Sequence, residues 1–122
     1  IEASIMAAPL YKLKAEFFKT LGHPARIRVL ELLAVGEHSV GELQAEVGVE
    51  SSNMSQQLAV LRRAGIVVAR KQGNSVIYSM ASPDIAELMA VARKVLTGVL
   101  NDQVSVLKDL KASTRAASRA AG

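Results

Sequence analysis

A helix start and a helix stop lie close together in the segment SVGELQAEVG, residues 39–48. Ser39 and Glu42 have the spacing of a capping box, in which each side chain accepts a hydrogen bond from the backbone N–H of the other residue. Gly48 is of the residue type that most often ends a helix. A new helix can start at once, because Ser51 or Ser52 can act as its cap. Two helices joined by such a short turn containing glycine are typical of a helix-turn-helix.

The second of these helices, SSNMSQQLAVLRR, has one apolar face and one polar face. At about 100° per residue, Met54, Leu58 and Leu61 fall on one narrow stripe, which we expect to be buried. The opposite side has small hydrogen-bonding side chains in place of the Glu–Lys pairs that stabilise solvated helices. Because such side chains can approach base edges in the DNA major groove, the polar face predicts a recognition helix.

Residues 51–83 contain no Asp or Glu, although the net charge of the chain is only +4. Arg62, Arg63, Arg70 and Lys71 lie in this acid-free region. A solvated surface is one interpretation of a basic stretch, and a surface for a polyanion is the other. The position of these residues, within and directly after the helix-turn-helix, favours the polyanion.

After Gly65, the segment IVVARKQGNSVIYSM has two β-rich runs around Gln72, Gly73 and Asn74. This pattern predicts a β-hairpin with a glycine turn. Arg70 and Lys71 lie beside its tip, as expected of a wing that contacts phosphates. A plain surface hairpin is the alternative, and the position directly after a helix-turn-helix favours the wing.

Helices are also expected on both sides of this region. Apolar spacing predicts one from about residue 11 to residue 21, and His23 followed by Pro24 marks the start of another that ends at Gly36. Ile27, Leu30 and Ala34 are its expected inward residues. A last helix should run from Pro83 to about residue 111.

The apolar stripe of the last helix is about 40 Å long at about 1.5 Å per residue, which is more than one small domain can cover. A second subunit is its simplest cover, and the first helix should join that interface. The residues expected at this dimer interface are Leu13, Phe17, Leu88, Ala92, Val95 and Val99.

Composition fits a single small, mostly helical domain. Half of the 122 residues are hydrophobic but only 3% are aromatic, so aliphatic side chains must form the core. We expect an N-terminal extension at residues 1–9, with the character of a tag remnant, a domain at 10–112 and a disordered tail at 113–122. Cysteine is absent and no apolar run is long enough for a membrane span, which favours a cytoplasmic protein without membrane contact.

Four segments together resemble the ArsR/SmtB family of regulators: LGHPARIRVLELL, SVGELQAEVG, SSNMSQQLAVLRRAGIV and RKQGNSVIYSM. The resemblance covers about residues 10–110 and rests on their order and spacing. It implies a mostly α (α+β) fold, a winged helix-turn-helix with N- and C-terminal dimerisation helices and a two-stranded β wing. It also implies a bacterial homodimer whose recognition helices enter successive major grooves of double-stranded DNA.

The resemblance places base-reading positions on Ser51, Ser52, Ser55 and Gln56. Wing contacts are implied for Arg70, Lys71 and Asn74. The polar face of the recognition helix adds Arg63, and its flank adds Asn53. The predicted DNA-binding set is therefore Ser51, Ser52, Asn53, Ser55, Gln56, Arg63, Arg70, Lys71 and Asn74.

Metal sensing is common in this family, but the sequence departs from the family's pattern. The segment SVGEL has no cysteine, and the matching positions of the last helix are Ser82, Asp84, Val95 and Gly98, of which only Asp84 could ligate. No cofactor is therefore predicted. The remaining candidates for nickel or zinc are His38 and Glu42, which could supply nitrogen and oxygen ligands. His23 is interpreted as a helix cap or a packed residue.

The sequence predicts a sequence-specific transcriptional regulator, a homodimeric repressor that binds an inverted-repeat operator. Alternatives are a nickel- or zinc-responsive regulator, a protein-interaction module with a degenerate helix-turn-helix, and a non-specific packaging protein. A modulating partner protein remains open, because no sensor is evident. An enzyme is not expected, since the chain has no cysteine, no nucleophile elbow and no His-Glu-x-x-His motif.

Overall fold

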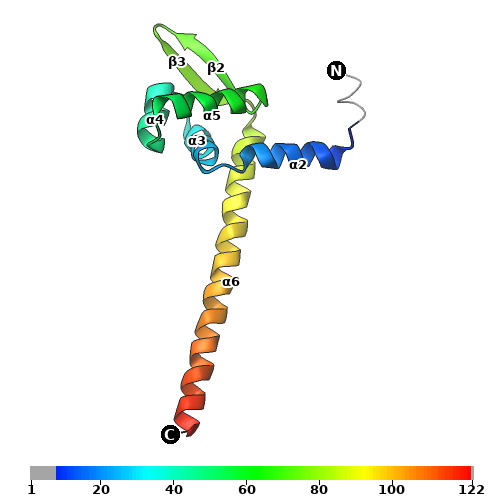
Figure 1. Ribbon diagram of the computed structural model, residues 1–122, viewed down its shortest axis with the longest axis vertical. Helices are drawn as coiled ribbons and strands as arrows, with labels where there is room; N and C mark the ends of the chain where they lie inside the picture. Colours follow the sequence, from blue (N-terminus) through cyan, green and yellow to red (C-terminus); the bar gives the residue numbers. More distant parts are fainter. Residues whose placement is uncertain (1–7, 122) are drawn as a thin grey trace. The chain divides into compact units, whose positions relative to one another are not determined.

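The computed structural model describes residues 8–121, so most of the predicted 1–9 extension lies outside the described residues (Figure 1). These residues form two compact units, one ending at Met89 and one beginning at Ala90. The elements are α2 (Leu10–Leu21), α3 (Pro24–Val35), β1 (His38–Ser39), α4 (Val40–Val47), α5 (Ser51–Arg63), β2 (Val67–Gln72), β3 (Ser75–Met80) and α6 (Pro83–Ala121).

The helix-turn-helix consists of α4 and α5. The capping box is confirmed: the Ser39 hydroxyl accepts the Glu42 N–H at 3.2 Å, and Glu42 Oε1 accepts the Ser39 N–H at 3.1 Å. Gly48 ends α4 with φ of 75°, a left-handed conformation that glycine adopts without a Cβ clash. The structure therefore confirms both ends of the helix before the turn.

The start of α5 differs from the sequence prediction. We expected Ser51 or Ser52 to cap the helix, but both lie inside its first turn, and Glu50 is the N-cap residue. The helix starts one residue earlier because the Glu50 carbonyl already accepts the Met54 N–H at 2.9 Å. No side chain accepts a hydrogen bond as the cap of α5. The serine hydroxyls are therefore not used as caps.

The predicted hairpin is confirmed as β2 and β3. Gln72 pairs with Ser75, which leaves Gly73 and Asn74 as a two-residue turn. Gly73 has φ of 62°, and glycine at the first turn position suits the type II′ turn that matches the twist of a hairpin. A third strand was not predicted from the sequence: β1 pairs with β3, so the sheet order is β1-β3-β2. A two-residue strand has no alternation by which a sequence could reveal it.

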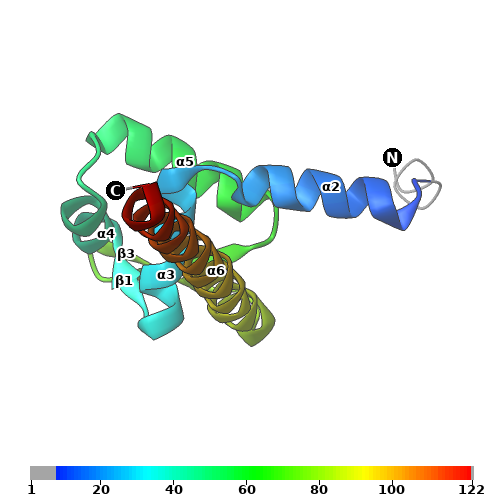
Figure 2. The ribbon, with the colours of Figure 1, turned by 90° about the horizontal axis from the view of Figure 1, so that it is seen from below.

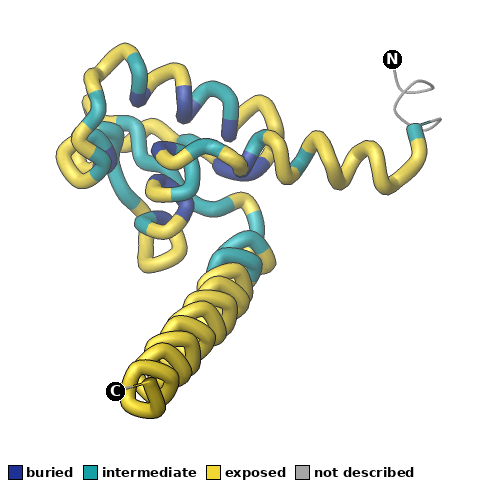
Figure 3. The backbone as a smooth tube through the Cα atoms, turned by 60° about the horizontal axis from the view of Figure 1, so that its bottom comes forward, coloured by how far each residue is buried: buried dark blue, intermediate teal, exposed yellow. Residues whose placement is uncertain are grey.

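The core lies between α3, α4, α5 and the first residues of β2 (Figure 3). Met54, Leu58 and Leu61 are buried as expected. In α3, Leu30 is buried and Ile27 half-buried, but the predicted inward residue Ala34 is exposed. The reason is that α3 packs against α4, α5 and β3 through a face centred on Ala25, Val29 and Leu33, and Ala34 lies outside that face (Figure 2). The buried residues of this core are Leu21, Val29, Leu30, Leu33, Leu43, Met54, Leu58, Leu61, Ile66 and Val67.

Helix α6 continues through the segment that we expected to be a disordered tail at 113–122. It ends at Ala121, and Gly122 lies outside the described residues. The segment lacks apolar periodicity, but its Ala and Arg residues are strong helix formers. The hydroxyl of Thr114 also donates to the Leu110 carbonyl at 3.0 Å. Within residues 8–121, α6 and the other helices are too short or too polar to cross a membrane.

Candidate nucleic-acid interface

The polar face of α5 is accessible along its predicted base-reading positions. Ser51, Ser52, Ser55 and Gln56 are all exposed. The buried stripe on the other side anchors this face to the core, because Met54, Leu58 and Leu61 are each at most 1% exposed. The helix therefore presents small hydrogen-bonding groups on a firmly packed element.

The N-terminus of α5 adds backbone donors to this face. The first N–H groups of a helix have no acceptor within the helix, and α5 has no capping side chain to accept them. The helix dipole also makes this end partly positive. Both properties favour a negatively charged group near Ser51.

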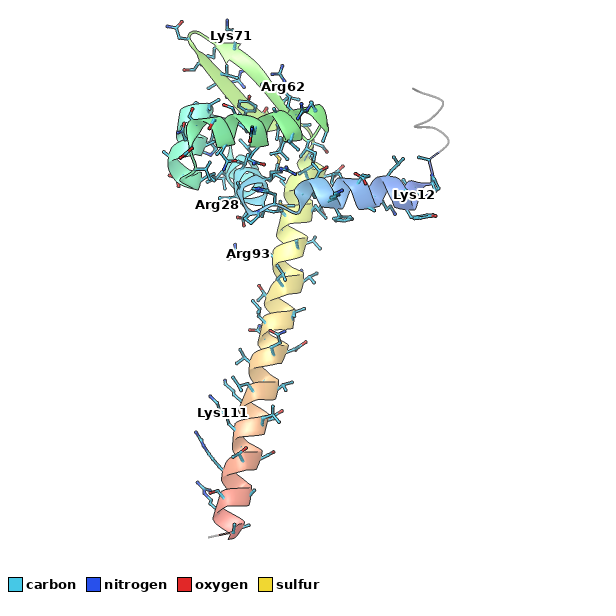
Figure 4. All side chains as sticks on the ribbon, in the orientation of Figure 1. Lys12, Arg28, Arg62, Lys71, Arg93 and Lys111 are labelled. Carbon is cyan, nitrogen blue, oxygen red and sulfur yellow. The ribbon has the colours of Figure 1, made fainter. Side chains whose placement is uncertain are left out.

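The other end of α5 carries cationic side chains. Arg62 and Arg63 are exposed in its last turn. Among residues 8–121, neither arginine forms an ion pair, and neither does Lys71 near the tip of the hairpin (Figure 4). These charges are therefore available to an external anion. Arg63 was among the DNA-binding residues predicted from the sequence, whereas Arg62 was not.

A cleft of about 480 Å³ joins the recognition helix to the sheet. It is lined by Val40, Ser55, Leu58, Ala59, Arg62, Arg63 and Tyr78. Tyr78 belongs to β3, so the fold brings a strand of the wing beside the arginines and Ser55 of α5. The two predicted DNA-binding elements therefore form one continuous surface.

The two cations of the wing have different surroundings. Arg70 Nη1 donates to Glu37 Oε2 in an ion pair, and Arg70 Nη2 donates to Gln72 Oε1 at 3.1 Å. Lys71 is the next residue of β2, so its side chain projects from the face of the sheet opposite to that of Arg70. The Arg70 charge is thus compensated within the protein, whereas Lys71 and the exposed turn residue Asn74 have no such partner in the described chain.

A hydrogen-bond network that the sequence analysis missed lies behind the base-reading face. Arg26 in α3 donates from Nε to Gln57 Oε1 at 2.8 Å and from Nη1 to the Thr20 carbonyl at 2.9 Å. Gln57 Nε2 donates in turn to Asn53 Oδ1 at 2.8 Å. Among the described polar residues only Gln57 is buried, with 8% of its surface exposed. The predicted DNA-binding residue Asn53 is half-buried and belongs to this network.

The candidate metal ligands are close together but few. His38 Nδ1 lies 3.5 Å from Glu42 Oε2. The pKa of Glu42 is below its ordinary value, first because its carboxylate accepts the Ser39 backbone N–H, and further because the Ser39 hydroxyl and His38 lie beside it. Within residues 8–121 no group of three or more His, Cys, Asp and Glu side chains could hold a metal ion. His23 is the cap of α3, since its Nδ1 accepts the Ala25 N–H at 3.1 Å.

The residues predicted for a dimer interface are mostly exposed within the single chain. In α2, Leu13 is exposed and Phe17 is half-buried. In α6, Leu88 is half-buried, while the rest of the predicted stripe is exposed, as are its apolar neighbours. These exposed α6 residues are Val91, Ala92, Val95, Leu96, Val99, Leu100, Val104, Val106, Leu107 and Leu110.

Comparison with known proteins places this geometry in a known group. A family described as a helix-turn-helix domain matches residues 21–70. The chain is 71% identical over 105 residues to the uncharacterized HTH-type transcriptional regulator Rv0081 of Mycobacterium tuberculosis. The aligned residues cover 85% of this chain and 92% of the relative. The crystal structure of Rv0081 superposes with a TM-score of 0.75, covering 80% of this chain and 99% of that chain.

Two further solved structures are similar. The transcriptional repressor BigR from Xylella fastidiosa has a TM-score of 0.66 and 35% identity, over 70% of this chain and 87% of that chain. The homodimeric winged helix-turn-helix DNA-binding domain of Mb0332 from Mycobacterium bovis, described as a possible ArsR-family transcriptional regulator, has a TM-score of 0.70 and 31% identity. That match covers 76% of this chain and 86% of the other.

Proposed function

Because the chain belongs to the ArsR family of winged helix-turn-helix transcriptional regulators, we propose that it is a homodimeric repressor that binds an inverted-repeat operator. The observation that carries this proposal is the exposed polar face of α5, anchored by a buried stripe and flanked by unpaired cations. Such a face has hydrogen-bonding groups for base edges and positive charge for phosphates. A repressor of this kind acts in the bacterial cytoplasm, where the operator is.

The apolar stripe of α6 supports the dimer. Val95 and Leu96 are each 59% exposed and Leu110 is 60% exposed, which is a large apolar surface for a single chain to leave in water. The similar Mb0332 domain is homodimeric. Two-fold symmetry then places the recognition helices about 34 Å apart, one turn of DNA, which is the spacing expected for the centres of the two half-sites.

Phosphate contacts should supply much of the affinity. Arg62, Arg63 and Lys71 are the cations of this surface without an ion pair among the described residues. Arg70 was predicted as a fourth contact, and it can take part only by leaving Glu37 or sharing its guanidinium. We therefore assign the main wing contact to Lys71, together with Asn74 at the turn.

No separate sensor function is proposed. His38 and Glu42 supply two ligands, whereas zinc sites in proteins need three or four. Regulation by a partner protein stays a prediction from the sequence. The protein-interaction module and the packaging protein are outcomes of the test that follows.

The test is a fluorescence-anisotropy titration against the protein's own upstream DNA and a scrambled duplex, over a range of salt concentrations, with and without nickel or zinc. We expect preference for the upstream DNA and a steep salt slope. Lys71→Ala should reduce the slope by about 0.9, the value for one phosphate contact in double-stranded DNA. Arg28→Ala is the matched control, since this exposed arginine lies on α3, away from the hairpin (Figure 4).

Each result has a definite reading. Equal weak binding to both duplexes would replace the proposal with a packaging role. An absence of binding even at low salt would favour the protein-interaction module. A metal-dependent change in affinity would restore the metal-responsive regulator.

A further inference from the structure

The amide groups of Asn53 and Gln57 have a fixed order of donors and acceptors. An arginine side chain has donors only, so the atom of Gln57 that faces Arg26 Nε must be its oxygen. The Gln57 amide nitrogen is then the atom that points along α5 toward Asn53. Because that nitrogen can only donate, the atom of Asn53 that receives it must be Oδ1.

This order decides which group Asn53 presents outward. Gln57 is buried and holds Oδ1, so the Nδ2 amino group is on the side of the Asn53 amide away from Gln57. No acceptor for Nδ2 is found among residues 8–121. Half-buried Asn53 lies on the flank of the polar face of α5, next to exposed Ser52 and Gln56, so its free group is a hydrogen-bond donor beside these predicted base-reading positions.

The network is also held from the other side. Arg26 is fixed by a second hydrogen bond, to the carbonyl of Thr20 in α2. A buried amide that is hydrogen-bonded through both its oxygen and its nitrogen, such as Gln57, rarely turns over, since a reversed amide would set its NH₂ against the guanidinium and leave donors unpaired. The orientation of Asn53 is therefore set by α3 and α2, not by α5 alone.

We propose that Arg26 and Gln57 are positioning residues that hold the Asn53 amide with its Nδ2 donor toward one base of each operator half-site. The inference rests on the proposed DNA-binding function. An asparagine usually reads adenine with its oxygen and nitrogen together. Here Oδ1 is turned toward Gln57 and Nδ2 faces outward, so Asn53 favours a base edge that has acceptors and no donor. In the major groove such edges belong to guanine, with N7 and O6, and to thymine, with O4; guanine has the larger number of acceptors.

The test reverses the order of the network. In Gln57→Glu the side chain still accepts from Arg26, but it can no longer donate to Asn53. The Asn53 amide then turns to donate to the carboxylate and presents Oδ1 outward. We expect selection of binding sites from a random DNA pool to shift at one half-site position, from guanine or thymine toward cytosine or adenine, whose amino groups donate. The ratio of affinities for the two bases should change by about tenfold or more.

Two matched variants show whether the shift passes through Asn53. Asn53→Asp, which has acceptors only, should produce the same change of base preference with Gln57 intact. The double variant Asn53→Ala with Gln57→Glu should have the preference of Asn53→Ala alone. Circular dichroism of each variant checks that the fold is retained.

The outcomes separate this inference from the proposed function. A wild-type protein without any sequence preference would overturn both. A wild-type protein with a clear preference, and a Gln57→Glu variant that keeps it with a uniform change in affinity, would overturn the positioning role alone.

A measurement on the wild-type protein guards against a variant that fails to fold. In the NMR spectrum, the side-chain NH₂ protons of Gln57 should exchange slowly with water and those of Asn53 rapidly. On binding the selected DNA, the Asn53 signal should shift and become protected, and on random DNA it should not. Rapid exchange at Gln57, or an unchanged Asn53 signal on the selected site, would contradict the proposal.

Discussion

At the residue scale, two adjacent glutamines of α5 have different environments. Gln56 is exposed on the base-reading face, whereas Gln57 is 8% exposed and hydrogen-bonded to Arg26 and Asn53. The helical period contains a signal for this difference, because Gln57 lies three residues after buried Met54 and four before buried Leu61. A polar residue at a core position requires an internal partner. The sequence alone could not name that partner, since Arg26 belongs to another helix.

Gln56→Ala tests the predicted base contact. If Gln56 reads a base, the variant should lose about 1–3 kcal/mol of binding free energy on the preferred operator and little on random DNA. Competition titrations on both duplexes measure this difference. Equal losses on the two would show that Gln56 contributes no sequence information.

Glu42 provides a test in which pH is the variable. The pKa of this carboxyl is lowered in the folded chain by the Ser39 backbone N–H, the Ser39 hydroxyl and His38. Its charge therefore stabilises the fold above the unfolded-state pKa of about 4.3, and the effect is lost as the pH falls through the lower folded-state value. Glu42→Gln keeps an acceptor for the cap but removes the charge.

We expect wild type to be more stable than Glu42→Gln at pH 7, and the difference to shrink as the pH falls below about 4. Urea unfolding followed by circular dichroism at several pH values measures the free energy of unfolding of both proteins. A difference that stays constant down to pH 3 would show that the charge of Glu42 has no part in it.

At the scale of elements, the turn between α4 and α5 depends on one backbone conformation. Gly48 has φ of 75° with open space around its Cα, so a side chain there meets no neighbour but strains the backbone. Such left-handed conformations cost a residue with a Cβ about 1–2 kcal/mol. The angle between the two helices is set at this turn, and with it the presentation of the recognition face.

Gly48→Ala should lower the free energy of unfolding by about 1–2 kcal/mol. Gly36→Ala is the matched control, because Gly36 also has open space around it but an extended backbone with φ of 170° that alanine adopts freely. Thermal or urea unfolding of both variants compares them directly. Similar losses for both would mean that backbone strain at Gly48 is not the cause.

At the scale of the whole molecule, the second unit has no core of its own. Every residue of α6 from Ala90 to the end of the described chain is exposed, although the helix has a continuous apolar stripe. An isolated helix of this kind gains most of its stability from packing. The proposed dimer would supply that packing.

Val99→Glu in this stripe should weaken the dimer, because it places a charge in an apolar interface. Thr97→Glu is the control on the same helix, since Thr97 lies off the stripe and its hydroxyl bonds to the Arg93 carbonyl. Sedimentation equilibrium should find the dimer in wild type and Thr97→Glu, and a shift toward monomer in Val99→Glu. A dimer of equal strength in all three would move the interface away from the α6 stripe.

Local signals of the sequence determined the succession of helices, the capping box, the glycine turns, the hairpin and the buried stripe of α5. Each depends on residues within one or two helical turns of each other, so periodicity and residue type suffice. The prediction of a disordered tail was wrong, because helix propensity can continue where apolar periodicity stops. The prediction of a serine cap for α5 was also wrong, because the bounds of a helix depend on backbone hydrogen bonds that residue types do not specify.

Only the tertiary structure decided which polar groups meet across elements. It paired Arg70 with Glu37, joined Arg26 to Gln57 and placed His38–Ser39 against β3. These partners are separated by many residues, and several exposed or half-buried polar side chains could have met each of them. Packing of α3 against α4 and α5 chose among the alternatives, because burial leaves a polar group only the partners that the surrounding core brings within hydrogen-bond distance.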